Sequence, residues 1–292
     1  MPLESGAMPP VTEGTFTLEG HRLAYTVYGD GPRVTVLVHG LLLSQRMHEQ
    51  LARALARRGH RVVTVDLLGH GRSDRPVDMW RYSMTTFGVE VVALLDHLEV
   101  DEAVVLGTSL GANTALEVAS LAPERLRGMV VEMPVLDNAL VGCALAFTPL
   151  MVALTFGEPL MRLLSFGARR VPRLPWQLDI VLDTVRQDPR PGAAVLQGLF
   201  FGRTAPHRKE RRTFQTPALV IGHRHDIVHP FSDAGMLVDE LPNGRLLEAN
   251  SILELRLAPE RLTGEIADFI DECWRPRTAA RRASGTRRRA AS

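Results

Sequence analysis

The sequence predicts an α/β fold in which a mostly parallel, doubly wound sheet carries helices on both faces. Nearly continuous apolar runs, such as residues 34–38, are typical of strands that are buried on both faces. Segments with helical periodicity alternate with these runs. The 292 residues are enough for one large core domain, or for a core domain with an insertion. In such a sheet, ligands bind beyond the carboxyl ends of the strands.

The individual elements follow from polarity and turn residues. Residues 15–18 and 22–27 alternate in polarity and predict an antiparallel hairpin at one edge of the sheet. The other expected strands are residues 34–38, 62–65, 103–106, 128–131 and 218–221. The expected helices are residues 45–58, 84–98, 112–121, 232–241 and 259–273.

One long segment interrupts the alternation. Residues 134–213 contain several prolines and no clear strand, which predicts a helical insertion. Within it, residues 139–157 carry no charge and approach the length of a membrane span. Because Pro149 divides them and they lie between strands of one sheet, we expect a lid helix over a pocket, or a homodimer contact, and no membrane span.

The predicted organisation has a flexible N-terminus (1–14), two parts of a core (15–133 and 214–274), a helical cap (134–213) and a disordered tail (275–292). Seven arginines and no acid occur in the tail, and we expect it to be solvated rather than to bind nucleic acid or anionic lipid. The first residues lack the pattern of a secretory signal, and the two cysteines match neither a disulfide framework nor a metal site. We therefore expect a cytoplasmic protein.

A short motif follows the expected strand 103–106. Gly107-Thr108-Ser109-Leu110-Gly111 joins this strand to a helix. A G-x-S-x-G motif indicates a nucleophilic serine only when it lies in such a strand-turn-helix segment. Small residues at both ends let strand and helix approach closely, so that Ser109 projects from a tight turn as a nucleophile. The alternative is a serine that caps the helix.

A serine nucleophile needs donors for the oxyanion that develops during acyl transfer. The backbone N–H of Leu110 can supply one, and that of Leu41, in the loop after strand 34–38, can supply another. We place His39 and Gly40 beside the substrate, although an imidazole at a strand end also serves to fix its loop. Glu132, at the end of the sixth strand, is a further candidate for substrate contact, with a solvent or lid contact as the alternative.

Together these motifs resemble the α/β-hydrolase superfamily, of the type with a helical cap inserted after the sixth strand. The resemblance covers about residues 15–273. Its marks are His39-Gly40, the loop 66–73, the turn around Ser109, and the segment 222–230. The resemblance implies an α/β-hydrolase fold and makes Asp226 the acid of a catalytic triad.

The histidine of that triad is expected in the loop before the last helix, and this sequence has none there. Residues 248–260 place Ser251 or Ile252 at the expected position, and no histidine occurs after His229. A serine without a neighbouring base is a poor nucleophile at neutral pH. A relocated histidine is one solution, and we choose His229, because the residues after Asp226 run along the pocket floor. The other candidates are His223, His225 and, more weakly, His207.

Other interpretations of these residues are also consistent with the sequence. The protein could keep the pocket but lack fast acyl transfer, acting as a binding protein or in lyase-like or proton-transfer chemistry. A partner chain or the substrate could also supply the base. His223, His225, His229 and Asp226 could form a metal site, although their place after the seventh strand favours the triad. No motif for a cofactor is present. The preferred hypothesis is a serine hydrolase for an apolar ester or related acyl or carbonyl compound.

Overall fold

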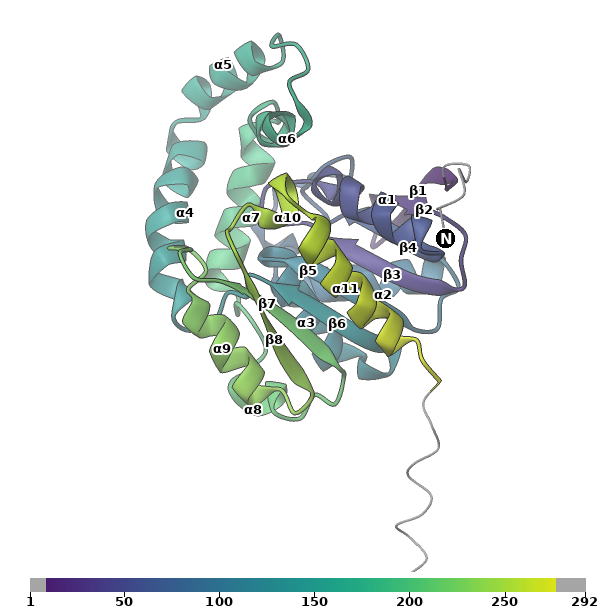
Figure 1. The fold of residues 1–292 in the computed structure, drawn as a ribbon. Coiled ribbons are helices and arrows are strands. Elements are labelled where there is room, and N and C mark those ends of the chain that lie inside the picture. The colour runs from purple at the N-terminus through teal and green to yellow at the C-terminus, as the bar shows by residue number, and fades with distance from the viewer. Residues whose placement is uncertain (1–8, 277–292) are drawn as a thin grey trace, which may run out of the picture.

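The computed structural model describes residues 9–276 and contains a mixed sheet of eight strands (Figure 1). The strand order is β1-β2-β4-β3-β5-β6-β7-β8; β1 pairs antiparallel with β2, β2 pairs antiparallel with β4, and all other pairs are parallel. The strands are β1 (Val11–Leu18), β2 (His21–Tyr28), β3 (Arg33–Val38), β4 (His60–Asp66), β5 (Ala103–Thr108), β6 (Leu126–Glu132), β7 (Ala218–His223) and β8 (Gly244–Ala249). The predicted α/β-hydrolase fold is confirmed.

Helices cover both faces of the sheet because alternate strand residues point to opposite sides. Val36 and Val38 of β3 share one apolar cluster with Leu94 and Leu116, whereas Leu37 lies in a second cluster on the other face. The helices of the core are α1 (Glu49–Arg57), α2 (Met84–His97), α3 (Leu110–Leu121), α9 (Phe231–Glu240), α10 (Glu254–Leu257) and α11 (Glu260–Cys273). Helices α2, α3 and α9 cover the first cluster, and α1 and α11 cover the second. Three 3-10 turns complete the core, at Gln45–His48, Met79–Arg81 and Pro123–Arg125.

The structure differs from one prediction at the N-terminal edge of the sheet. Residues 11–14, expected to be flexible, belong to β1, where Val11 pairs with Tyr28 and Gly14 with Tyr25. Most of this stretch is exposed, so backbone hydrogen bonds rather than buried side chains hold it in the sheet. Its sequence therefore shows no alternation of polarity from which the strand could be predicted. The hairpin turns through Glu19 and Gly20, both with positive φ, as a two-residue turn that matches the twist of the strands.

The segment between β6 and β7 is helical. It contains α4 (Ala139–Phe156), α5 (Glu158–Ala168), α6 (Trp176–Val185), α7 (Pro189–Phe201) and α8 (Arg208–Arg211). Figure 1 shows α4 to α7 at one end of the sheet, with α4 and α7 beside each other and α5 farthest from the core. These helices stand over the carboxyl ends of the parallel strands, where the loops after β3, β5 and β7 meet. The predicted tail from residue 277 onward lies outside the described residues.

Candidate active site

Ser109 occupies a sharp turn between β5 and α3. Its backbone has φ 54° and ψ −109°, a sparsely populated conformation for a residue with a side chain. The turn is held because the Ser109 amide donates to the Glu132 carbonyl at 2.8 Å. A Cβ at Gly107 would lie 1.9 Å from the Gly111 carbonyl oxygen, and a Cβ at Gly111 would lie 2.1 Å from that of Val38. The two glycines of the motif are therefore required by backbone contact, and they let Ser109 project from the turn.

Three side chains form a continuous chain of hydrogen bonds at this turn. The Ser109 Oγ lies 2.8 Å from Nε2 of His229, and Nδ1 of His229 lies 2.9 Å from Oδ2 of Asp226. The side chains of His229 and Asp226 are 14% and 9% exposed, so water screens their interaction only weakly. A proton on Nδ1 satisfies the Asp226 carboxylate and leaves Nε2 free to accept the Ser109 proton, as general-base catalysis requires.

The loop after β7 explains how His229 reaches this place. Oδ1 of Asp226 accepts the amide N–H groups of Val228 and His229 at 2.8 and 2.9 Å, which folds the loop into an Asx-type turn. The His229 side chain then folds back so that Nδ1 of its imidazole lies beside the other oxygen of the same carboxylate, Oδ2. Burial alone raises the pKa of Asp226, but the hydrogen bonds from His229 and Val228 outweigh it and lower the pKa below its usual value. Asp226 therefore stays ionised beside His229.

The other histidines that we considered do not contact Ser109. His223 is buried, with Nδ1 2.9 Å from the carbonyl of Ser251. Its ring thus connects β7 to the very loop in which the triad histidine was expected. His225 and His207 are exposed. Within residues 9–276, no group of three or more His, Cys, Asp or Glu side chains has an arrangement suited to a metal ion.

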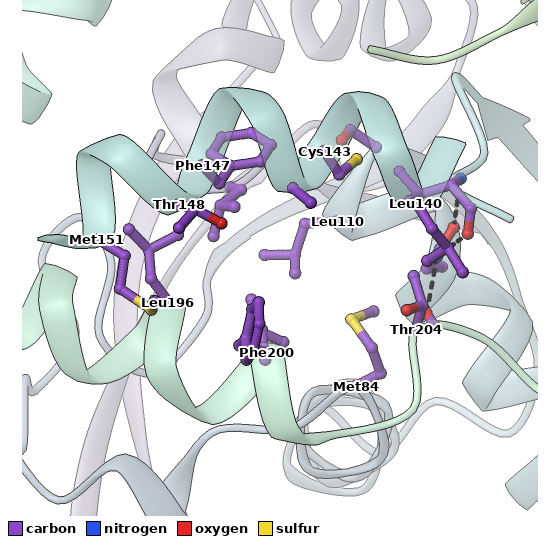
Figure 2. A pocket seen from close by; sticks show the side chains of 16 residues that line it. Met84, Leu110, Leu140, Cys143, Phe147, Thr148, Met151, Leu196, Phe200 and Thr204 are labelled. Carbon is purple, nitrogen blue, oxygen red and sulfur yellow. Dashed lines mark hydrogen bonds between the residues drawn. The ribbon is translucent and has the colours of Figure 1, made fainter. Parts of the chain in front are cut away.

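A cavity of about 310 Å³ opens above Ser109 (Figure 2). None of its 16 lining residues is charged, and most are apolar. Helix α4 forms one wall with Cys143, Phe147 and Met151 among others, and α7 faces it with Leu196 and Phe200. Burial raises the pKa of the Cys143 thiol to about 11, so it is a neutral part of the wall. The cavity suits an uncharged, apolar ligand.

Leu41 and Leu110, the predicted oxyanion donors, both line this cavity beside Ser109. Leu110 is the first residue of α3, so its N–H belongs to the free donors at a helix N-terminus. Leu42 has a positive φ of 59°, and the Leu43 amide donates to the Gly40 carbonyl, so the loop after β3 turns sharply at Leu41. Within the described residues, neither the Leu41 nor the Leu110 amide donates a hydrogen bond.

Comparisons with known proteins agree with this architecture. Residues 34–150 match the sequence model described as the alpha/beta hydrolase fold. Over nearly the whole chain, the structure is similar to the enol-lactonase from Burkholderia xenovorans LB400, with a TM-score of 0.71, 23% identity, and coverage of 88% of this chain and 100% of that one. The chain has the α/β-hydrolase fold. Another similar structure of this α/β-hydrolase fold is an epoxide hydrolase from Vigna radiata, with a TM-score of 0.73, 19% identity, and coverage of 91% and 100%.

Curated relatives match this chain over shorter stretches. The "Bifunctional epoxide hydrolase 2" of Sus scrofa is 31% identical over 135 residues, which are 44% of this chain and 24% of that protein. The "3-hydroxybutyrate-oligomer hydrolase" of Cupriavidus necator is 34% identical over 113 residues, 38% of each protein. The chain thus matches between about a quarter and two fifths of the length of these relatives.

Three predicted substrate contacts need correction. His39, Gly40 and Glu132 do not line the cavity. His39 is fully buried; its Nδ1 lies 2.8 Å from the Gly40 carbonyl, and its Nε2 accepts the Leu67 amide at 3.1 Å. This ring fixes the loop after β3 and carries its proton on Nδ1. Burial lowers the pKa of His39, which keeps it neutral.

Glu132 is fully buried behind the nucleophile and belongs to an ion pair that sequence reasoning missed. Arg256 of α10 donates to both of its carboxylate oxygens, and Thr108, which precedes Ser109, donates to Oε2 at 2.5 Å. Burial raises the pKa of Glu132, but the charge and hydrogen bonds of Arg256 outweigh this effect and hold it far below its usual value. The pair joins the loop before α11 to the end of β6. An arginine in that loop was the only sequence signal.

Two buried polar side chains fix the cap to the core. Nδ2 of Asn113 donates to the carbonyls of Val135 and Thr204, both at 2.7 Å, and so links the two ends of the helical insertion. The Asp233 carboxylate accepts three amide N–H groups at the start of α4, from Leu136, Asn138 and Ala139, at 2.8 to 3.0 Å. These amides are the free donors of a helix N-terminus, where negative charge is favourable. The cavity therefore has a fixed floor and a firmly attached lid.

Proposed function

We propose that this protein is a serine hydrolase of apolar esters or related acyl compounds, with Ser109 as nucleophile, His229 as base and Asp226 as the acid that orients it. The observation that carries the proposal is the chain of hydrogen bonds from Ser109 through His229 to Asp226 beneath an uncharged cavity. The hydrolase names of the relatives are consistent with it.

The geometry supports a two-step reaction. Nε2 of His229 takes the proton of Ser109 as its oxygen attacks the acyl carbon, and the amides of Leu41 and Leu110 stabilise the developing oxyanion. The protonated imidazole, held by Asp226, then gives that proton to the leaving alkoxide. Water attacks the acyl-enzyme by the same route in reverse, which releases the acid and restores Ser109.

The cavity wall sets the expected substrate preference. Its side chains carry no charge that could bind a polar or ionic acyl group. Each methylene of an acyl chain that is buried in the cavity should stabilise the bound transition state by about 0.8 kcal/mol, which raises kcat/KM about fourfold. A series of nitrophenyl esters should therefore show rising kcat/KM with acyl length until the cavity is full. Equal activity across the series, or activity only on small polar esters, would contradict this preference.

Labelling with a fluorophosphonate probe tests the activation of the serine. We expect the wild-type protein to be labelled, and the Ser109→Ala variant not to be. The His229→Ala variant should label far more slowly, whereas His225→Ala, which alters an exposed histidine of the same loop, should label like the wild type. If neither the wild type nor any variant reacts, the protein is better described as a receptor for an apolar ligand, or as a catalyst of non-hydrolytic chemistry.

A further inference from the structure

The outer side of the cap exposes large apolar side chains in unusual density. Six of them define what we call the cap surface. They lie on α4 and α5 and have exposed fractions of 55% to 82%: Val141, Leu145, Phe156, Leu160, Leu163 and Phe166. Isolated exposed apolar residues are normal, but a group on two successive helices marks a surface that contacts something else.

Helix α4 is apolar on both of its sides. Its 18 residues have a mean hydropathy of 2.1, only 11% of them are buried, and by length and composition it is the one helix among residues 9–276 that could cross a membrane. A helix at a protein surface normally turns a polar face to water. Here the inner face lines the cavity with Phe147 and Met151, so removing α4 into a bilayer would dismantle the cavity. The arrangement favours a helix that lies on a membrane.

Arginines lie beside the apolar side chains. Residues 139–173 contain four arginines and a single acid, Glu158. Arg169 and Arg170 donate to the main-chain carbonyls of Arg186 and Phe166 and, within the described residues, pair with no carboxylate. The Arg170 guanidinium also lies 3.5 Å from the centre of the Phe166 ring. Arginine at the edge of an apolar surface reaches the phosphate groups of lipids while its stem stays among the acyl chains.

The same charges argue against a second copy of the chain as the occupant. In a twofold dimer, the same surface faces itself, so the second copy would bring the same four arginines and only one acid, Glu158, which already pairs with Arg162 of its own chain. An anionic bilayer instead offers an excess of negative charge. Charge complementarity therefore favours a lipid surface over the homodimer that the sequence also allowed.

The cavity opens at the edge of the cap surface. Leu140 of α4 and Phe200 of α7 line the cavity and are also 47% and 59% exposed, so they form its rim. An apolar substrate concentrates in a membrane rather than in water. If the cap surface rests on a bilayer, such a substrate reaches Ser109 along an apolar path.

We propose that the cap surface docks on a bilayer that contains anionic lipid, with α4 and α5 in the interfacial plane. The apolar side chains enter the headgroup boundary, and Arg169 and Arg170 bind lipid phosphates. The docking needs no catalysis, and the Ser109→Ala variant should bind vesicles as well as the wild type does. If the proposed hydrolase activity is not found, this inference still stands. If vesicle binding is not found, the proposed hydrolase activity still stands.

Co-sedimentation of the full chain with vesicles of phosphatidylglycerol and phosphatidylcholine tests the inference. We expect binding to mixed vesicles and little binding to pure phosphatidylcholine. Val141→Glu should lower the partition coefficient by about tenfold or more, because it places a charge at the boundary. Val77→Glu is the matched control, since Val77 lies outside the cap and is 64% exposed against 70% for Val141. Replacing Arg169 and Arg170 together by alanine should weaken binding by about thirtyfold.

The seven arginines of residues 275–292 also attract anionic lipid, and the variants separate the two effects. If the basic tail alone causes binding, Val141→Glu and Val77→Glu will bind equally, and the inference is overturned. Absence of binding to mixed vesicles overturns it as well. So does a dimer in sedimentation velocity that Val141→Glu converts to monomer, because the occupant is then a second copy. Circular dichroism and thermal melting confirm that each variant is folded.

Discussion

The Asp226→Asn substitution separates the two tasks of the Asp226 carboxylate. Oδ1 accepts the Val228 and His229 amides, and Oδ2 faces Nδ1 of His229. In the asparagine variant, the side-chain oxygen can still accept both amides, so the loop should keep its turn. The side-chain NH₂ then faces Nδ1 and forces the imidazole proton onto Nε2. Nε2 can no longer accept the Ser109 proton.

This reversal of the tautomer sets the expected loss. In Ser-His-Asp triads it lowers the rate by about 10⁴-fold, which corresponds to about 5.5 kcal/mol of transition-state stabilisation. The measurement is kcat/KM on a nitrophenyl ester together with the rate of fluorophosphonate labelling. The melting temperature should change little, whereas Asp226→Ala should lower both activity and stability, because it leaves the two amides without an acceptor. An Asp226→Asn rate within tenfold of the wild type would refute the assigned role of His229.

Three further substitutions test other parts of the structure. Burial raises the pKa of Glu90 from 4.5 to about 8. The protonated side chain therefore contributes stability at low pH, and this contribution is lost as the pH rises through about 8. Glu90→Gln should remove this loss, so the melting temperature of the variant should fall less between pH 5 and 9 than that of the wild type. Arg256→Met should destabilise the fold by about 3–5 kcal/mol in urea denaturation at pH 7, because it leaves the Glu132 carboxylate buried without its partner; a loss below about 1 kcal/mol would contradict the ion pair. Gly111→Ala should abolish fluorophosphonate labelling, since its Cβ would meet the Val38 carbonyl, and normal labelling would contradict the geometry of the turn.

The sequence predicted the features that depend on local chemistry. Apolar runs located the buried strands, and the glycines around Ser109 indicated the turn because a backbone contact of this kind excludes side chains. His229 could be chosen because the residues after Asp226 were expected to run along the pocket floor. The structure brings Ser109, His229 and Asp226 into contact, although their catalytic roles stay predictions.

Features that depend on contacts distant in the sequence were missed. Glu132 was placed beside the substrate because its partner Arg256 lies 124 residues away, and nothing local marks the pair. The strand at residues 11–14 was missed because an exposed edge strand needs only backbone hydrogen bonds. His39 was placed beside the substrate, whereas its ring fixes its own loop, which was the alternative that its position at a strand end indicated.

The Asp226–His229 turn has a consequence for how this protein tolerates change. Acid and base are held by one short stretch of main chain, so their relative position is independent of how β8, α10 and α11 are placed against the sheet. The segment from β8 onward, in which the histidine was expected, contributes no side chain to the Ser109 hydrogen-bond chain. Insertions or sequence drift between β8 and α11 should therefore leave proton transfer intact, as long as Arg256 keeps its bond to Glu132.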